Sequence, residues 1–239
     1  MIIYIKNISI EGPGLIGDFF DNADHPSVTI DLYQGDRLPQ SPEGTDGIIV
    51  LGGPMNVYEE GKYPYLSEEC KFIRKAADRG IPFMGICLGA QLLAKTFGAA
   101  VKRSPVPEIG YYTAELTEKG REDPLFSGMG EVMRVFQWHE DTFDIPPDGE
   151  ALAAGELCPN QAFRIGDHAY GLQFHFEVTS EMVKRWIKEY SEEGKEYSEK
   201  AGKLLEDEKN FRKTLENEAY RICRNFENIM RYRSENERL

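Results

Sequence analysis

Residues 81–94 read IPFMGICLGAQLLA, an apolar run followed at once by a helical pattern. The run IPFMGI is almost wholly apolar, which is typical of central parallel strands covered on both faces. Cys87 stands at the junction, with Gly85 and Gly89 two residues to either side. Glycine–x–nucleophile–x–glycine is the pattern of an elbow, a sharp strand-to-helix turn with strained backbone geometry. The segment therefore predicts a buried strand, a tight turn, and a helix that begins beside Cys87.

This predicted position gives the Cys87 thiol a chemical role. The positive end of a helix dipole and unpaired N–H groups stabilise a thiolate, and a thiolate is the nucleophilic form of cysteine. The flanking glycines leave space beside the turn because they carry no Cβ atom. The alternative is that they serve helix–sheet packing only, and this short pattern by itself leaves both interpretations open.

The pattern outward from residues 81–94 indicates an α/β sheet. Short apolar runs alternate with amphipathic ones: MIIYI, then DGIIVLGGP, then a helical stretch over Leu66–Arg79. This order is typical of parallel strands with crossover helices. Between residues 111 and 173 the runs become shorter and are separated by turn residues, which predicts further strands, some of them antiparallel.

The C-terminal part has a different composition. A helix is predicted from about Thr179 to Tyr190, and a charge-rich segment without proline follows. From Phe211 onward, apolar residues recur every three or four positions, which predicts an amphipathic helix. Its apolar face either docks on its own domain or forms a dimer or partner interface. We therefore expect an α/β domain over residues 1–190 and a charged helical C-terminal extension over residues 191–239.

Composition and charge exclude several classes of protein. The chain of 239 residues carries 28 Lys and Arg against 41 Asp and Glu, a formal charge of -13. This charge disfavours nucleic-acid partners and anionic membranes. The apolar runs fall short of the roughly 20 residues that span a bilayer, and the N-terminus lacks the features of a secretory signal. Four widely spaced cysteines without a C-x-x-C pair indicate reduced thiols, so we expect a cytoplasmic protein.

A cysteine nucleophile needs a base and a third group that orients the base. The run YGLQFHFE, residues 170–177, supplies both candidates in His175 and Glu177. Being two residues apart, they project to the same side of an extended segment. Cys, His and Glu are also zinc ligands, but one distant cysteine with an H-x-E pair fits no closed structural site. We therefore expect a Cys87–His175–Glu177 triad without a metal or cofactor.

With these residues in place, the chain resembles the class I (triad-type) glutamine amidotransferases, in a stand-alone branch similar to the amidotransferase part of GMP synthase. The resemblance rests on GGP at 52–54, GICLGAQ at 85–91, WHED at 138–141 and GLQFHFE at 171–177. It covers roughly residues 45–190. It implies a flavodoxin-like open mixed sheet with helices on both faces. It also implies attack of a thiolate on the glutamine side-chain amide, release of ammonia, and hydrolysis of a γ-glutamyl thioester.

The resemblance also implies roles for individual residues. Cys87 is the nucleophile, His175 the general base and then acid, and Glu177 the group that holds His175. Backbone N–H groups of Gly53 and Leu88 would bind the oxyanion, as preorganised donors do. The remaining residues implied to contact the substrate are Gln91, Trp138, Glu140 and Asp141. His139 receives no catalytic part and is interpreted as a structural or surface residue.

Three functions remain open at this point. The first is a glutamine amidotransferase or glutaminase that acts alone or feeds ammonia to a separate synthetase subunit, since the sequence holds no G-x-x-x-x-G-K-[ST] phosphate loop. The second is a γ-glutamyl peptide or conjugate hydrolase with the same triad. It is favoured by Glu140, where many family members have glycine. The third is a non-catalytic regulatory module. The ammonia acceptor and a homodimer also remain open.

Overall fold

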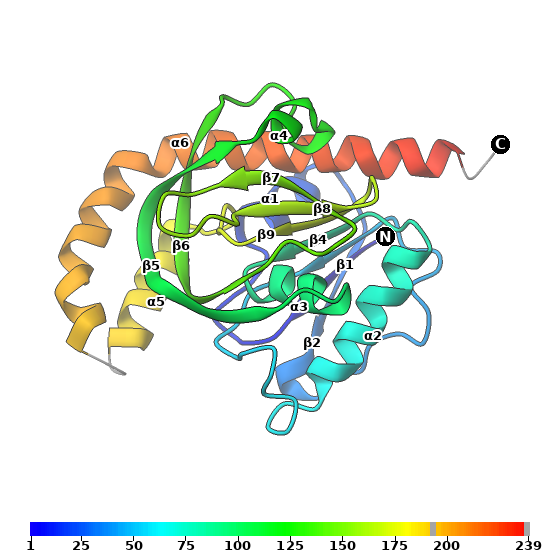
Figure 1. Cartoon of the computed structure of the whole chain (residues 1–239), viewed down its shortest axis with the longest axis horizontal. Helices are drawn as coiled ribbons and strands as arrows, with labels where there is room; N and C mark the ends of the chain where they lie inside the picture. Colours follow the sequence, from blue (N-terminus) through cyan, green and yellow to red (C-terminus); the bar gives the residue numbers. More distant parts are fainter. Residues whose placement is uncertain (192–194, 237–239) are drawn as a thin grey trace.

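The computed structural model describes residues 1–191 and 195–236, so the predicted extension at 192–194 and 237–239 lies outside the described residues. The described chain forms one nine-stranded sheet with helices around it (Figure 1). The strands are β1 Ile2–Lys6, β2 Ser27–Asp31, β3 Gly47–Val50, β4 Phe83–Ile86, β5 Val101–Leu116, β6 Val132–Phe143, β7 Gly149–Ala154, β8 Ala162–Ile165 and β9 Ala169–Leu172. The α-helices are α1 Gly14–Asn22, α2 Tyr65–Asp78, α3 Leu88–Thr96, α4 Glu118–Glu122, α5 Ser180–Ser191 and α6 Lys195–Asn236.

The sheet is mixed, in the order β2-β1-β3-β4-β9-β8-β7-β5-β6. Its first five strands run parallel, and β3, β4 and β9 are buried along their whole length. This burial explains why their sequences are continuous apolar runs and not alternating ones. The remaining strands pair antiparallel, and the long β5–β6 ribbon curls away from the parallel half (Figure 1). The predicted α/β fold with an open mixed sheet is confirmed.

Helices cover both faces of the parallel half. Side chains alternate across each strand, so Ile2 and Tyr4 of β1 face α1 and α6, while Ile3 and Ile5 face α2. The two buried clusters place α1 with α6 on one face and α2 with α3 on the other. Each helix therefore buries its apolar stripe against the sheet, as the spacing predicts.

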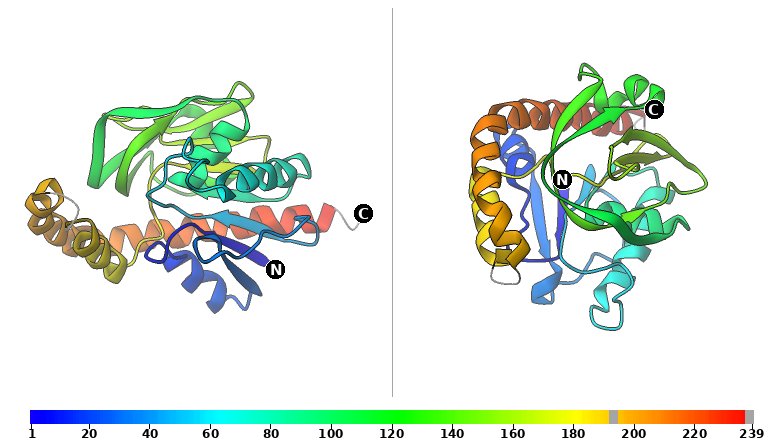
Figure 2. Two further views of the ribbon diagram at one scale, coloured as in Figure 1. Left: turned by 90° about the horizontal axis from the view of Figure 1, so that it is seen from below. Right: turned by 60° about the vertical axis from the view of Figure 1, so that its left-hand side comes forward.

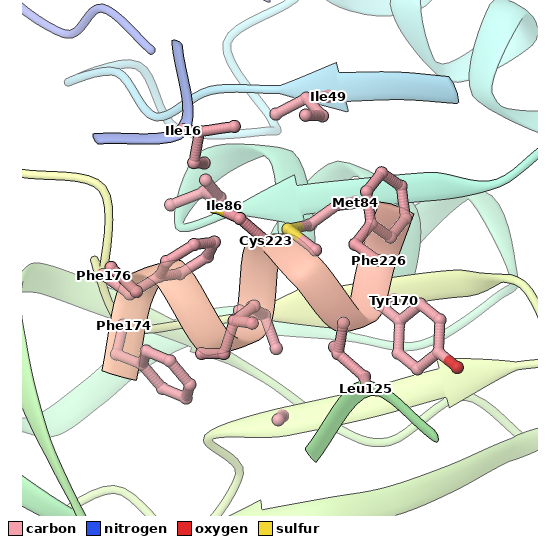
Figure 3. Close-up of a cluster of buried hydrophobic side chains, with 14 of the residues drawn as sticks. Ile16, Ile49, Met84, Ile86, Leu125, Tyr170, Phe174, Phe176, Cys223 and Phe226 are labelled. Carbon is pink, nitrogen blue, oxygen red and sulfur yellow. The ribbon is translucent and has the colours of Figure 1, made fainter. Parts of the chain in front are cut away.

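Helix α6 begins at Lys195, earlier than the predicted start near Phe211. The residues before 211 are mostly charged, so their helical periodicity is weak in the sequence. Of its predicted apolar positions, Leu215, Ala219, Ile222 and Phe226 are buried against the chain's own core, and Ile229 is partly buried. Figure 3 shows Phe226 and Cys223 of α6 among core side chains of the sheet. The first half of α6 lies beside α5, and together they extend past the edge of the sheet (Figure 2). No helix within 1–191 or 195–236 has the length and the apolar composition to cross a membrane.

Candidate active site

Strand β4 leads through Cys87 directly into α3. Cys87 has φ 50° and ψ -104°, a left-handed backbone that a residue with a side chain rarely adopts. A Cβ atom on Gly85 would lie 2.4 Å from the backbone of Gly89, and one on Gly89 would lie 2.3 Å from the Val50 carbonyl oxygen. Both glycines are therefore required by close backbone approach around a strained turn.

His175 and Glu177 follow β9, the strand that pairs with β4. The imidazole Nδ1 donates a hydrogen bond to the Glu177 carboxylate at 2.7 Å, and both side chains are 1% exposed. The ring of Trp186 packs edge-on against the imidazole, with centroids 4.9 Å apart. The bond to Glu177 sets the tautomer, so the Nε2 atom of His175 is the one left for proton transfer.

The surroundings of His175 favour its charged form. Burial opposes the charge, but the Glu177 carboxylate and hydrogen bonds to Cys87 and Glu177 outweigh it and raise the pKa of His175 well above its usual value. The Cys87 sulfur also accepts a hydrogen bond from Gln173 Nε2 at 3.7 Å. A hydrogen-bond donor to the sulfur and a charged imidazole beside it are the groups that nucleophilic attack and protonation of a leaving group require.

A pocket of about 210 Å³ opens beside Cys87. It brings together most of the residues that the sequence predicts for the site: Gly53, Cys87, Gln91, Trp138, Glu140 and Asp141. Residues not predicted also line it, namely Glu11, Pro54, Met55, Asn56, Arg103, His139 and Tyr190. Leu88 is the first residue of α3, so its N–H has no partner within the helix, and Gly53 packs against the Leu88 side chain. The oxyanion and substrate-contact roles of these residues stay predictions.

Polar contacts fix the wall opposite the elbow. Gln91 Nε2 donates to the Asp141 carbonyl oxygen at 3.2 Å and to Gln173 Oε1 at 3.3 Å. The Tyr58 hydroxyl donates to Asp141 Oδ2 at 2.9 Å, and Arg103 lies 3.9 Å from Asp141 Oδ1. Arg103 also forms an ion pair with Glu140 at 2.5 Å. The Glu140 carboxylate is thus neutralised by a cation at the same pocket.

His139 is buried within this pocket wall, which corrects the idea of a surface histidine and agrees with a structural one. Its Nδ1 donates to the Asp141 carbonyl oxygen at 2.9 Å, and its Nε2 lies 3.0 Å from Glu108 Oε2, which also accepts from Gln161. The ligand atoms of Glu108, His139 and Cys158 lie within 4.8 Å of one another, close enough to hold a metal ion. Hydrogen bonds within the protein already engage all three groups. Support of the Trp138–Asp141 segment by these hydrogen bonds therefore accounts for the cluster without a metal ion.

Among the pocket residues that the sequence did not predict, Glu11 and Arg103 were missed for different reasons. Glu11 follows the first parallel strand, and side chains at the carboxyl ends of such strands meet at one edge of the sheet, so a signal was present. Arg103 reaches the site because the pairing of β5 and β6 shifts register between Arg103 and Glu108. The shift spans Pro105 and Pro107, which lack the N–H group that a strand ladder needs, but these prolines do not by themselves place Arg103 at the site.

Comparison with known proteins agrees with this geometry. The family model described as "Glutamine amidotransferase class-I" matches residues 24–189. A glutamine amidotransferase-like protein of Salmonella typhimurium, YfeJ, is 36% identical over 165 residues, which cover 68% of this chain and 69% of that protein. A subunit of the glutamine-hydrolysing GMP synthase of Pyrococcus abyssi is 37% identical over 135 residues, 55% of this chain and 66% of that one. Against the GMP synthase of Porphyromonas gingivalis, which is 35% identical, the matched region spans only 28% of the relative's length.

Solved structures show the same relationship. A glutamine amidotransferase from Thermotoga maritima superposes with a TM-score of 0.87 at 35% identity, covering 94% of this chain and 96% of that one. A glutamine amidotransferase from Methylobacillus flagellatus gives a TM-score of 0.88 at 30% identity, covering 95% and 94%. The match therefore includes the C-terminal helices as well as the sheet. The chain belongs to the class I glutamine amidotransferase family.

Proposed function

We propose that this enzyme hydrolyses the side-chain amide of glutamine through a thioester on Cys87 and releases ammonia. The observation that carries the proposal is the buried His175–Glu177 hydrogen bond of 2.7 Å beside a cysteine strained at φ 50° in the wall of a pocket. A buried charge pair and a strained backbone are both costly, and such features gather at functional sites.

The reaction would proceed in two halves. The Cys87 thiolate attacks the γ-carbonyl carbon, a C–S bond forms, and the carbonyl electron pair moves to an oxyanion bound by the N–H groups of Gly53 and Leu88. Collapse of this intermediate breaks the C–N bond, and the proton on His175 Nε2 passes to the departing nitrogen, which leaves as ammonia. Water then gives a proton to His175 and attacks the thioester. The C–S bond breaks, so that glutamate leaves and the thiolate is restored.

The remaining pocket residues support binding of the amino-acid end of the substrate. Asp141, with Oδ1 buried and without a hydrogen-bond partner among the described residues, offers an acceptor for the substrate ammonium group. Arg103, paired with Glu140, offers guanidinium N–H groups to a carboxylate. Gln91 and the backbone of Trp138 complete the binding site for the amino-acid end of the substrate.

The fate of the ammonia leads to a partner proposal. The Pyrococcus abyssi relative is named as a subunit of GMP synthase, so the name itself describes a chain that is one part of an assembly. We propose that ammonia from this site is used by a separate synthetase subunit.

We also propose a cytoplasmic location. All four cysteines are free, which is the state that a reducing compartment maintains.

A second candidate function keeps the triad and changes the substrate. The Arg103–Glu140 pair stands at the pocket, with the Arg103 side chain 63% exposed. An exposed guanidinium there can take the C-terminal carboxylate of a γ-glutamyl peptide as readily as the α-carboxylate of glutamine. This candidate would make the enzyme a γ-glutamyl peptide hydrolase that needs no synthetase.

The experiment that tests both measures ammonia and glutamate from glutamine, beside glutamate from a γ-glutamyl dipeptide. We expect glutamine to yield equal amounts of ammonia and glutamate, with Cys87→Ala inactive and Cys70→Ala, a matched cysteine outside the pocket, fully active. Cleavage of the dipeptide with glutamine untouched would assign the second function. Turnover of neither substrate would leave the regulatory module as the remaining hypothesis and overturn the proposal.

A further inference from the structure

The pocket beside Cys87 is lined by a third carboxyl group, Glu11, in addition to Glu140 and Asp141. Glu11 lies on the loop between β1 and α1, is 6% exposed, and lines the same pocket as Cys87. The proposed mechanism does not use it. A carboxyl group buried at a reacting centre is costly unless it has a function there.

The position of Glu11 is defined by Gly52. A Cβ atom on Gly52 would lie 2.2 Å from Glu11 Oε2 and 3.0 Å from His175 Cε1. Both atoms therefore occupy the space directly above this glycine, and the carboxyl oxygen is a neighbour of the imidazole edge. The other oxygen, Oε1, accepts a hydrogen bond from the Tyr190 hydroxyl at 3.4 Å. Tyr190 thus anchors one oxygen and leaves the other beside His175.

Opposing influences act on the pKa of Glu11. Burial raises the pKa of Glu11 to about 7, the Glu177 carboxylate also raises it, and the His175 charge and the Tyr190 hydrogen bond lower it. In either protonation state the carboxyl group keeps an oxygen lone pair that can accept a hydrogen bond. An acceptor is therefore present beside His175 across the neutral pH range.

The two ends of the pocket have different tasks. Gln91, Arg103 and Asp141 form the wall that suits the amino-acid end of a substrate. The departing nitrogen must lie near His175, because His175 gives it a proton. Glu11 is the pocket carboxyl next to that imidazole, so it faces the nitrogen and not the amino-acid end.

Resting on the proposed function, we infer that Glu11 is a catalytic residue that accepts a hydrogen bond from the departing amide nitrogen. As the C–N bond breaks, His175 Nε2 delivers its proton to the nitrogen, and one N–H of that nitrogen points to Glu11 Oε2. No proton is transferred to Glu11, and ammonia, or the amine of an N-substituted γ-glutamyl amide, leaves neutral. The contact strengthens as the nitrogen gains positive character, so it favours the transition state over bound substrate.

The test compares an amide with an ester in the full-length enzyme. Glutamine and the γ-methyl ester of glutamate share the acyl group, but the methoxy leaving group has no N–H to donate. We expect Glu11→Leu to lower kcat/KM for glutamine by about 10- to 100-fold, the usual range for the loss of one charge-assisted hydrogen bond. For the ester, kcat/KM should change by less than about threefold. Glu11→Gln, which keeps the shape and one acceptor oxygen, should show a smaller loss with the same preference. Glu218→Gln removes a partly buried carboxyl on α6 that does not line the pocket and whose pKa burial also raises to about 7, and is the control.

Each result is decisive. Equal losses on both substrates, with slower alkylation of Cys87, would mean that Glu11 only positions His175 and would overturn the inference. Unchanged turnover of glutamine by both Glu11 variants would overturn it as well. A wild-type enzyme that hydrolyses neither substrate would refute the proposed function itself, which separates that failure from the failure of the Glu11 inference.

Discussion

Replacing Glu177 by glutamine separates a catalytic role of this carboxylate from a structural one. The side chain keeps its size, while the charge beside His175 disappears. The lost interaction is a charge-assisted hydrogen bond of 2.7 Å between two groups that are each 1% exposed. Such bonds contribute about 1.5–3 kcal/mol, and two unit charges about 4 Å apart contribute about 4 kcal/mol at an effective dielectric constant of 20. At about 1.4 kcal/mol per tenfold change in rate, we expect kcat to fall by roughly 10- to 1000-fold.

The same change should leave the fold intact. Glu177 Oε2 is buried and has no hydrogen-bond partner among the described residues, so the carboxylate is only half satisfied. An amide costs less to bury than a half-satisfied charge, and without Glu177 the imidazole of His175 avoids an unpaired buried charge by losing its proton. We therefore expect Glu177→Gln to fold with a Tm close to that of the wild type at a pH where His175 is neutral, while activity falls.

The assay measures ammonia release and the pH dependence of Cys87 alkylation on the same samples as thermal melts. Without the Glu177 charge the pKa of His175 drops. In a plot of the Cys87 alkylation rate against pH, the transition caused by ionisation of His175 should therefore move to lower pH. Wild-type kcat in Glu177→Gln would refute the triad. A loss of activity matched by a large fall in Tm would show that Glu177 is a structural residue.

Three further predictions concern other groups. Iodoacetamide should label Cys87 fastest near neutral pH, because burial raises the pKa of each of the other three cysteines; mass spectrometry of the labelled peptides measures this, and equal labelling contradicts an activated thiolate. Stability should fall as pH rises from about 5 to 8, because burial raises the pKa of Glu69 to about 8 and the folded state then holds a proton that the unfolded chain releases. Melts of Glu69→Gln should show a flatter dependence on pH, and an unchanged slope would contradict this cause. Chelators should leave ammonia release unchanged, and loss with EDTA that zinc restores would overturn the metal-free mechanism.

The elbow could be predicted because its information is local. Gly85, Cys87 and Gly89 lie within five residues, and their spacing already specifies a close strand-to-helix turn. His175 and Glu177 are likewise two residues apart on an extended segment. Their approach to Cys87 follows from β4 and β9 being neighbours, with Gly85 opposite Gly171, and the sequence indicates this pairing only through the family resemblance.

The parts that could not be predicted depend on distant pairings. The burial of His139 requires Glu108 to lie opposite it on the neighbouring strand, which the register of β5 and β6 decides. Glu11 follows a parallel strand, so its edge of the sheet was predictable, but its approach to His175 depends on how the loop after β1 packs on Gly52. Charged side chains are usually solvated, so composition alone assigns such residues to the surface. Glu108 breaks this rule and the sequence pattern misses it, whereas the equally buried Glu177 is predicted from its spacing to His175.

Detection of the covalent intermediate would test the proposed mechanism most directly. The enzyme is mixed with glutamine, quenched in acid during turnover, digested, and analysed by mass spectrometry for a γ-glutamyl group. We expect a glutamyl thioester on the peptide that contains Cys87, absent from Cys87→Ala and accumulating when the deacylating base is weakened in Glu177→Gln. Steady ammonia release by Cys87→Ala, or a glutamyl group on a different residue, would contradict the assignment of Cys87 as the nucleophile.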